Sequence, residues 1–313
     1  MSNLRVPFLG VYRSFAMGLI LVALPAEPCS ICRCGDPTFN ALGKEGYITR
    51  GFRLALDWER FDKQEGLLEE EAEELVENRL TALASYGFSD RFTIYGRVPL
   101  SHRDFTELEG GVTAESFETR GLSDPELYGQ AQLWASRFSG GLGRRSSVSL
   151  LAGVKTALGN NDYQRDGERV DEHAQPGTGS TDPFAGLAAL RLLDRWSALF
   201  ASVQYRHTGE NGYGYRYGRI ALANLAYERK FAERFDGVLE LNYRFAGEDQ
   251  AASETVPNTG GSLLYVTPRL LVDVGGGVVL RAAVQVPLAR DLNGAQKEKA
   301  VANVGLSFLV GPR

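Results

Sequence analysis

The sequence predicts an all-β fold: a transmembrane, antiparallel, up-and-down β-barrel of about twelve strands with both termini on the periplasmic side. Three observations favour this fold. Glycine accounts for 36 of the 313 residues and aromatic residues for 10%, whereas the chain has only 2 methionines and 3 cysteines. Long segments alternate between apolar and polar side chains. The connections between these segments alternate between short and long.

Alternation with a period of two marks the strands. In the first segment the even-numbered residues from Phe52 to Trp58 are apolar, and Arg53, Asp57 and Glu59 lie between them. Because successive side chains of a strand point to opposite faces, this segment has one apolar face and one charged face. Strands of soluble sandwiches average five or six residues, and these segments are about twice as long, the length that a tilted strand needs to cross a membrane.

Twelve segments of this kind follow one another, and an even number is the rule for single-chain bacterial outer-membrane barrels. The expected strands span residues 47–61, 74–87, 91–104, 122–137, 146–158, 183–193, 196–208, 215–231, 236–247, 262–274, 277–289 and 299–310.

The connections sort by parity. Those that leave odd-numbered strands are long and polar, at 62–73, 105–121, 159–182, 209–214, 248–261 and 290–297. Those that leave even-numbered strands are mostly short turns, at 88–90, 137–145, 193–195, 232–235 and 275–276. Short turns at one end and long loops at the other are typical of outer-membrane barrels, whereas a soluble β-barrel, the alternative fold, has no reason to sort its loops in this way.

One segment fits less well. Residues 64–80 are rich in glutamate and leucine and consist of helix formers, so a helical turn is an alternative there. We expect the first half to be an acidic outer loop and the second half to belong to the second strand.

The N-terminus has the features of a secretory signal. Arg5 and Arg13 precede a short apolar run that ends at Ala26, and this run is too short to span a bilayer as a helix. We therefore expect a signal peptide at 1–26, a periplasmic cysteine-containing segment at 27–45 and the barrel at 46–311. The expected location is the outer membrane of a Gram-negative cell.

The polar faces of the strands predict a lumen that carries both signs of charge. Residues expected to line a path for solutes are Arg53, Asp57, Glu59, Arg97, Gln204, Arg206, Glu240 and Arg244. Mixed signs argue against strong selectivity for anions or cations. The alternative is structural, because opposite charges paired across strands also fill the inside of a barrel that transports nothing.

All three cysteines lie in one short segment directly after the expected cleavage site. Cys29, Cys32 and Cys34 have the spacing Cys-x₂-Cys-x-Cys, and Asp36 follows as a harder, fourth ligand. Soft thiolates favour copper, zinc or an iron–sulfur cluster. A disulfide with one free thiol, and attachment or cross-linking to a partner, are alternatives that the spacing leaves open. Because Arg33 follows Cys32, the segment is not a haem attachment site.

Other classes of function find little support in the sequence. His102, His173 and His207 are expected to be solvated residues at the outer rim, without the close pair that a metal site needs. A barrel enzyme such as an outer-membrane lipase would need a serine beside a histidine in its active site, and His-x-Ser does not occur. Nucleic acid is not an expected partner, because the 34 lysines and arginines are fewer than the 39 aspartates and glutamates.

Several short glycine-rich stretches resemble the Gram-negative outer-membrane "transporter" family that is loosely named for a MetA pathway of phenol degradation. They are Gly121–Leu127, Gly153–Gly159 with Gln175–Pro183, and Gln285–Leu288 with Leu292–Gln296. The resemblance implies a barrel that passes or binds small solutes. One departure is the C-terminus, since such barrels usually end in an aromatic residue and this chain ends in Gly311-Pro312-Arg313.

Two hypotheses for the function follow. The first is a porin-like channel or transporter for small solutes in the outer-membrane bilayer, with a periplasmic thiolate segment that binds metal or takes part in redox chemistry. The second is a non-conducting membrane anchor that presents the cysteine segment to copper or another metal, or to a periplasmic redox partner.

Overall fold

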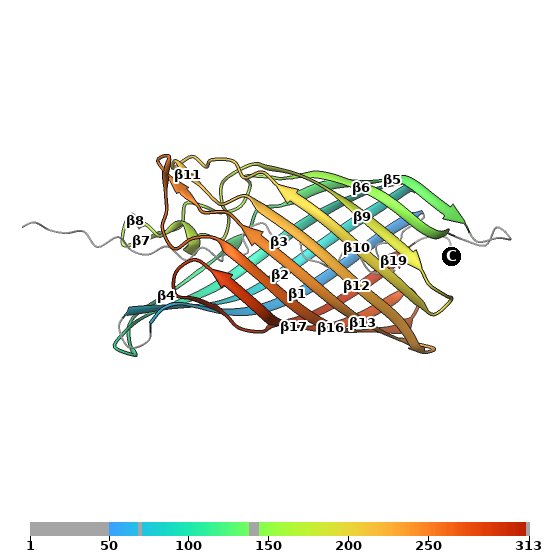
Figure 1. Cartoon of the computed structure of the whole chain (residues 1–313). Helices are drawn as coiled ribbons and strands as arrows, with labels where there is room; N and C mark the ends of the chain where they lie inside the picture. Colours follow the sequence, from blue (N-terminus) through green and yellow to red (C-terminus); the bar gives the residue numbers. More distant parts are fainter. Residues whose placement is uncertain (1–49, 68–70, 138–143, 311–313) are drawn as a thin grey trace, which may run out of the picture.

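The computed structural model describes residues 50–67, 71–137 and 144–310. Within these residues the chain forms a closed antiparallel β-barrel of twelve strands, and each strand pairs with its neighbours along the chain (Figure 1). The barrel closes because β1 pairs with both β2 and β19, with Phe52 opposite Tyr86 on one side and Val310 on the other. The predicted fold class is confirmed.

Fourteen elements make up the twelve positions in the wall, because β4 and β5 together form the fourth and β18 and β19 the twelfth. The elements are β1 (Gly51–Gly66), β2 (Glu71–Ser89), β3 (Phe92–Glu109), β4 (Val112–Leu122), β5 (Glu126–Arg137), β6 (Arg144–Lys155), β9 (Asp182–Leu192), β10 (Ser197–Arg206), β12 (Ile220–Ala232), β13 (Phe235–Ala246), β16 (Gly261–Gly275), β17 (Val278–Leu292), β18 (Gln296–Glu298) and β19 (Val301–Val310).

Short elements lie in the long connections. These are β7 (Gln164–Arg165), β8 (Glu168–Arg169), the 3₁₀-helix η3 (Glu172–Ala174), β11 (Tyr215–Arg216), β14 (Gln250–Ala251) and β15 (Glu254–Thr255). We call the end of the barrel that carries them the loop end, which lies at the left of Figure 1, and the opposite end the turn end. Both Gly51 and Val310 lie at the turn end, since the two strands pair there. In the described part of the chain, helices with the length and hydropathy to cross a membrane are absent.

An apolar belt surrounds the outside of the wall. On β2 the outward residues from Leu80 to Phe88 are apolar, whereas Asn78 and Glu74 follow towards the loop end. Nine residues at about 3.3 Å each, tilted by about 40°, give a belt about 23 Å tall. Lipid-facing belts of outer-membrane barrels measure about 25 Å, so the belt fits the hydrocarbon core of a membrane.

The first four strands reach farther at the loop end than the sequence predicted. The expected loops at 62–73 and 105–121 are wrong: β1 continues to Gly66, β2 begins at Glu71, and β3 and β4 form a hairpin with a tight turn. The acidic stretch before residue 74 is therefore strand where the structure describes it, with Glu65 opposite Glu73. Beyond the belt the outward face meets water, so it loses the apolar residues that identify a strand in the sequence.

Candidate functional site

The interior of the barrel is charged. Seven of the eight expected lumen residues are buried with their side chains inward, and Gln204 is half-buried. The buried residues are Arg53, Asp57, Glu59, Arg97, Arg206, Glu240 and Arg244. Placing charges in a low dielectric is costly unless each has a partner of opposite sign, so the partners decide what this interior can do.

The partners form ion pairs that reach across strands. Glu126 of β5 accepts hydrogen bonds from Arg97 Nη1 at 2.7 Å and from Arg206 Nη2 at 2.6 Å. Glu240 accepts one from Arg269 Nε at 2.7 Å. Because these carboxylates lie within hydrogen-bond distance of arginines on other strands, the charges neutralise one another locally.

A fourth pair spans the full width of β19. Arg281 Nη2 of β17 donates to Asp57 Oδ1 of β1 at 2.9 Å, and Gly305 lies on the strand between them. A Cβ atom at Gly305 would lie 2.0 Å from Asp57 Oδ1 and 3.0 Å from Arg281 Nε. A side chain at residue 305 would have to displace this ion pair, because the pair occupies the space that a Cβ atom needs.

A separate cluster of polar side chains lies at the loop end, where β6 ends at Lys155 and β9 begins at Asp182. Lys155 Nζ donates to Asp124 Oδ2 at 2.8 Å and to the Ser180 carbonyl at 2.9 Å, and it lies 3.0 Å from Asp182 Oδ2. It also donates to Thr178 Oγ1. We call these five residues the Lys155 cluster. All five are buried, so the single ammonium group is surrounded by acceptors and screened from water.

The Lys155 cluster joins the glycine-rich stretches singled out in the sequence. Asp124 lies in the stretch Gly121–Leu127, Lys155 in Gly153–Gly159 and Thr178 in Gln175–Pro183. Asp124 also accepts hydrogen bonds from Thr178 N at 2.8 Å and from Gly159 N at 3.0 Å. Sequence analysis did not identify this cluster. The available signal was an aspartate, a lysine and an aspartate at three neighbouring strand ends.

Residues 156–181, which connect β6 to β9, lie across the loop end and are called the cap segment. On one side Arg103 Nη1 of β3 donates to the His173 carbonyl at 2.8 Å and Thr119 Oγ1 of β4 donates to the Ala174 carbonyl at 2.6 Å. On the other side Tyr217 Oη donates to the Glu172 carbonyl at 2.8 Å. The cap segment is thus fastened to two separate parts of the rim, and Figure 1 shows β7 and β8 at this end of the barrel.

His173 is buried, which makes the prediction of a solvated rim histidine wrong for this residue. Its Nε2 lies 2.8 Å from Tyr215 Oη and 3.2 Å from Asp249 Oδ2. Tyr215 Oη in turn donates to Asp249 Oδ2 at 2.7 Å, and burial together with the Asp249 charge raises the pKa of Tyr215. The pattern of the sequence could not reveal this, because the cap segment turns inward only through contacts with distant loops. His207 is exposed, as predicted.

A cavity of about 480 Å³ lies between the cap segment and the inner face of β2, β3 and β4. Its walls include the rings of Phe105 and Phe117, the carboxylates of Glu73 and Glu107, and Arg165 from the cap segment. Glu73 lies beyond the apolar belt. Burial and the neighbouring Asp171 and Glu107 charges raise its pKa to about 7.

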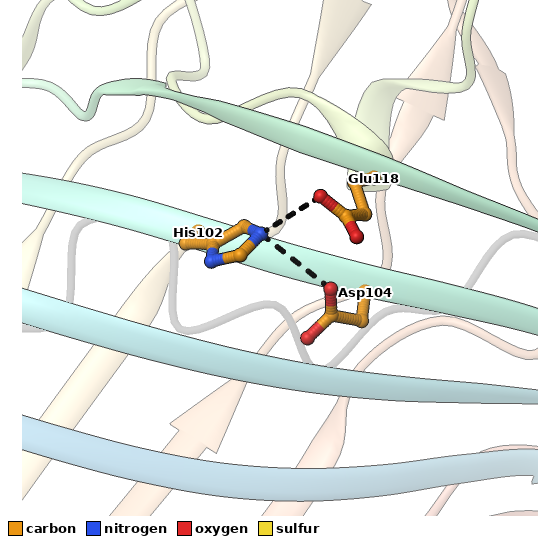
Figure 2. A group of neighbouring side chains, drawn as sticks. All are labelled: His102, Asp104 and Glu118. Atoms are coloured by element: carbon orange, nitrogen blue, oxygen red, sulfur yellow. Dashed lines mark hydrogen bonds and ion pairs between the residues drawn. The ribbon is translucent and has the colours of Figure 1, made fainter.

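The outward side of the same hairpin carries a group of three potential metal ligands. His102 Nε2 lies 3.2 Å from Glu118 Oε2 and 3.5 Å from Asp104 Oδ1, and Figure 2 shows both carboxylates pointing toward the imidazole ring. His102 follows Leu100 on the outward face, so the group borders the apolar belt outside the barrel. His102 is exposed, as predicted, but two carboxylates accompany it, which sequence spacing alone did not reveal. The group lies outside the interior that a solute would cross.

The expected metal ligands Cys29, Cys32, Cys34 and Asp36 lie outside the described residues. Their role, as metal ligands or as a disulfide with a free thiol, stays a prediction.

Comparison with known proteins supports the fold. No family model matches the chain, and no curated protein matches it. The solved structure of the COG4313 outer membrane channel from Pseudomonas putida F1 superposes with a TM-score of 0.63 at 12% identity, covering 84% of this chain and 96% of that one. The β domain of the Bordetella autotransporter BrkA gives a TM-score of 0.46 at 12% identity, covering 84% of this chain and 100% of that one. The Ralstonia pickettii toluene transporter TbuX gives 0.44 at 9% identity, with 85% and 91% covered.

The apolar belt, the charged interior and the first of these likenesses define a class: the chain has the fold of an outer-membrane β-barrel.

Proposed function

We propose that the protein is an outer-membrane channel for small solutes, exported by its N-terminal signal and oriented with the loop end outside the cell. The observation that carries the proposal is the combination of an apolar outer belt with a charged, neutralised interior. A wall that is apolar on one side and polar on the other supports a polar path across a bilayer. The likeness to the Pseudomonas putida channel supports the same conclusion.

The cap segment makes this a selective channel rather than an open pore. Its hydrogen bonds to Arg103, Thr119 and Tyr217 hold it across the loop end, so a solute has to pass beside it. The cavity between the cap segment and the β2–β4 wall is the point of first contact. From there a solute enters the charged interior of the barrel.

Uptake of solutes into proteoliposomes tests this function. The full-length mature chain, reconstituted into vesicles, is expected to admit small radiolabelled solutes faster than vesicles without protein. An Arg103→Ala variant loses the hydrogen bonds to the His173 and Gln175 carbonyls of the cap segment, and it is expected to admit these solutes faster still. Uptake equal to that of empty vesicles for both proteins would refute the proposal in favour of the anchor.

We further propose that the segment with Cys29, Cys32, Cys34 and Asp36 binds a soft metal ion in the periplasm. The segment precedes Gly51, which lies at the turn end, opposite the cap segment. Three thiolates within six residues suit Cu(I) or Zn²⁺. Metal analysis and thiol counting on the wild type and on a Cys29/Cys32/Cys34→Ser variant test this: bound metal that is lost in the variant supports it, and one free thiol without metal refutes it.

A further inference from the structure

We propose that the cavity at the loop end binds a small organic cation: a protonated amine on an aromatic or apolar body. The inference rests on the proposed channel function, because it names the class of solute that the channel receives at its outer mouth.

One wall of the cavity is aromatic. Leu75, Phe105 and Phe117 face one another across β2, β3 and β4, and the two phenyl rings stack with their centroids 5.0 Å apart and their planes 8° apart. The guanidinium group of Arg165 lies 5.2 Å from the Phe117 ring centre. Ring faces attract both other rings and cations, and here one cation already lies on that wall.

The next row of side chains towards the loop end is acidic. The strand register places Glu73 opposite Glu107, and Glu107 opposite Glu115. Like charges directly opposite on neighbouring strands are destabilising. Glu115 pairs with Arg165, but within the described residues neither Glu73 nor Glu107 forms an ion pair. Two adjacent carboxylates therefore lack a counter-charge beside an aromatic wall.

The three basic residues of the cap segment that line the cavity have acidic partners of their own: His173 Nε2 lies 3.2 Å from Asp249 Oδ2. Arg165 is committed to Glu115, and Arg169 makes two hydrogen bonds to Glu172 at 2.6 and 2.9 Å. The acidic residues Asp166, Glu168 and Asp171 also line the cavity. The field inside the cavity therefore favours a cation and disfavours carboxylate-bearing solutes.

Size and shape favour an organic cation over a metal ion. Ligand pockets have volumes of about 300–1,000 Å³, and this cavity of about 480 Å³ has room for an aromatic ring and a short chain. A divalent ion would bind the carboxylates but leave the aromatic wall unused. The raised pKa of Glu73 supports the same assignment. The neighbouring Asp171 and Glu107 charges contribute to raising this pKa, and a bound ammonium group would offset their repulsion.

Binding of three matched probes to the full-length protein in detergent tests the inference. Benzylamine is positive, benzyl alcohol neutral and benzoate negative, and all three carry the same ring. Saturation-transfer NMR and calorimetry are expected to give benzylamine an affinity at least about tenfold above the other two, as a charge-assisted contact provides. Its affinity should rise between pH 6 and pH 8 as Glu73 ionises.

Matched variants locate the site. Glu73→Gln/Glu107→Gln is expected to lower benzylamine affinity about tenfold and to leave benzyl alcohol unchanged. Phe117→Leu should weaken the binding of both benzylamine and benzyl alcohol. The control is Glu118→Gln, which changes a carboxylate on the outward face of the same hairpin and should alter neither.

Three outcomes would overturn the inference: equal binding of the amine and the alcohol, binding that survives Glu73→Gln/Glu107→Gln, or displacement of benzylamine by Mg²⁺ at lower concentration than by a second protonated arylalkylamine such as phenethylamine. The two proposals fail separately. Vesicle uptake without amine binding would refute only the cation site, and amine binding without uptake would refute only the channel.

Discussion

Lys155 is a buried cation that lies between two buried carboxylates. Its side chain is 0% exposed, and the Asp124 and Asp182 side chains that it contacts at 2.8 and 3.0 Å are 2% and 3% exposed. Replacing Lys155 with methionine keeps the length of the side chain and removes the ammonium group. Two carboxylates then lie buried without a cation, and breaking a buried ion pair in this way costs about 3–5 kcal/mol.

Urea unfolding of the protein in lipid vesicles, followed by the fluorescence of its 3 tryptophans, measures this loss. The matched control is Lys299→Met, which removes a lysine whose 55% exposed side chain lies 4.0 Å from Glu74. An exposed pair contributes about 0–1 kcal/mol, so this variant should unfold almost as the wild type does.

A rescue variant separates charge from packing. Lys155→Met combined with Asp124→Asn and Asp182→Asn removes the stranded charges and should recover a large part of the lost stability. A Lys155→Met protein within about 1 kcal/mol of the wild type would refute the reasoning, since it would mean that water reaches the carboxylates.

Three further predictions concern other parts of the barrel. Gly305→Ala places a methyl group 2.0 Å from Asp57 Oδ1 and should lower the free energy of unfolding by about 1–3 kcal/mol; an unchanged urea midpoint would contradict this. The pKa of Glu73 is raised from 4.5 to about 7 in the folded protein, so its contribution to stability is lost as the pH rises through this window. Glu73→Gln should therefore gain stability over the wild type at pH 8 and little at pH 5, and a pH-independent difference would count against the raised pKa. Arg103→Ala removes two hydrogen bonds to the cap segment and should make trypsin cleavage within that segment faster; cleavage at the wild-type rate would show that other contacts hold it.

The sequence predicts the fold well wherever the membrane constrains it. Between Phe52 and Trp58 the lipid requires apolar residues on one face, so alternation identifies the strand. Beyond the apolar belt the outward face no longer contacts lipid, so its residues need not be apolar. The outward residues Asp62 and Glu74 then look like loop residues, although the ladder between β1 and β2 continues there.

The candidate site is less predictable because its partners are distant in the chain. Alternation identifies Asp57 as an inward residue, but its partner Arg281 is 224 positions away and meets it only when the barrel closes. The buried place of His173 depends likewise on contacts with Tyr215 and Asp249 from two other loops. The sequence predicts which residues face inward, and the closure of the barrel decides which of them meet.

Single-channel recording in planar lipid bilayers tests the central claim most directly. The proposed channel predicts discrete current steps from the purified full-length protein, with more frequent or larger openings in Arg103→Ala. An electrically silent bilayer with both proteins, each shown to be inserted and folded, would contradict the channel and leave a membrane anchor.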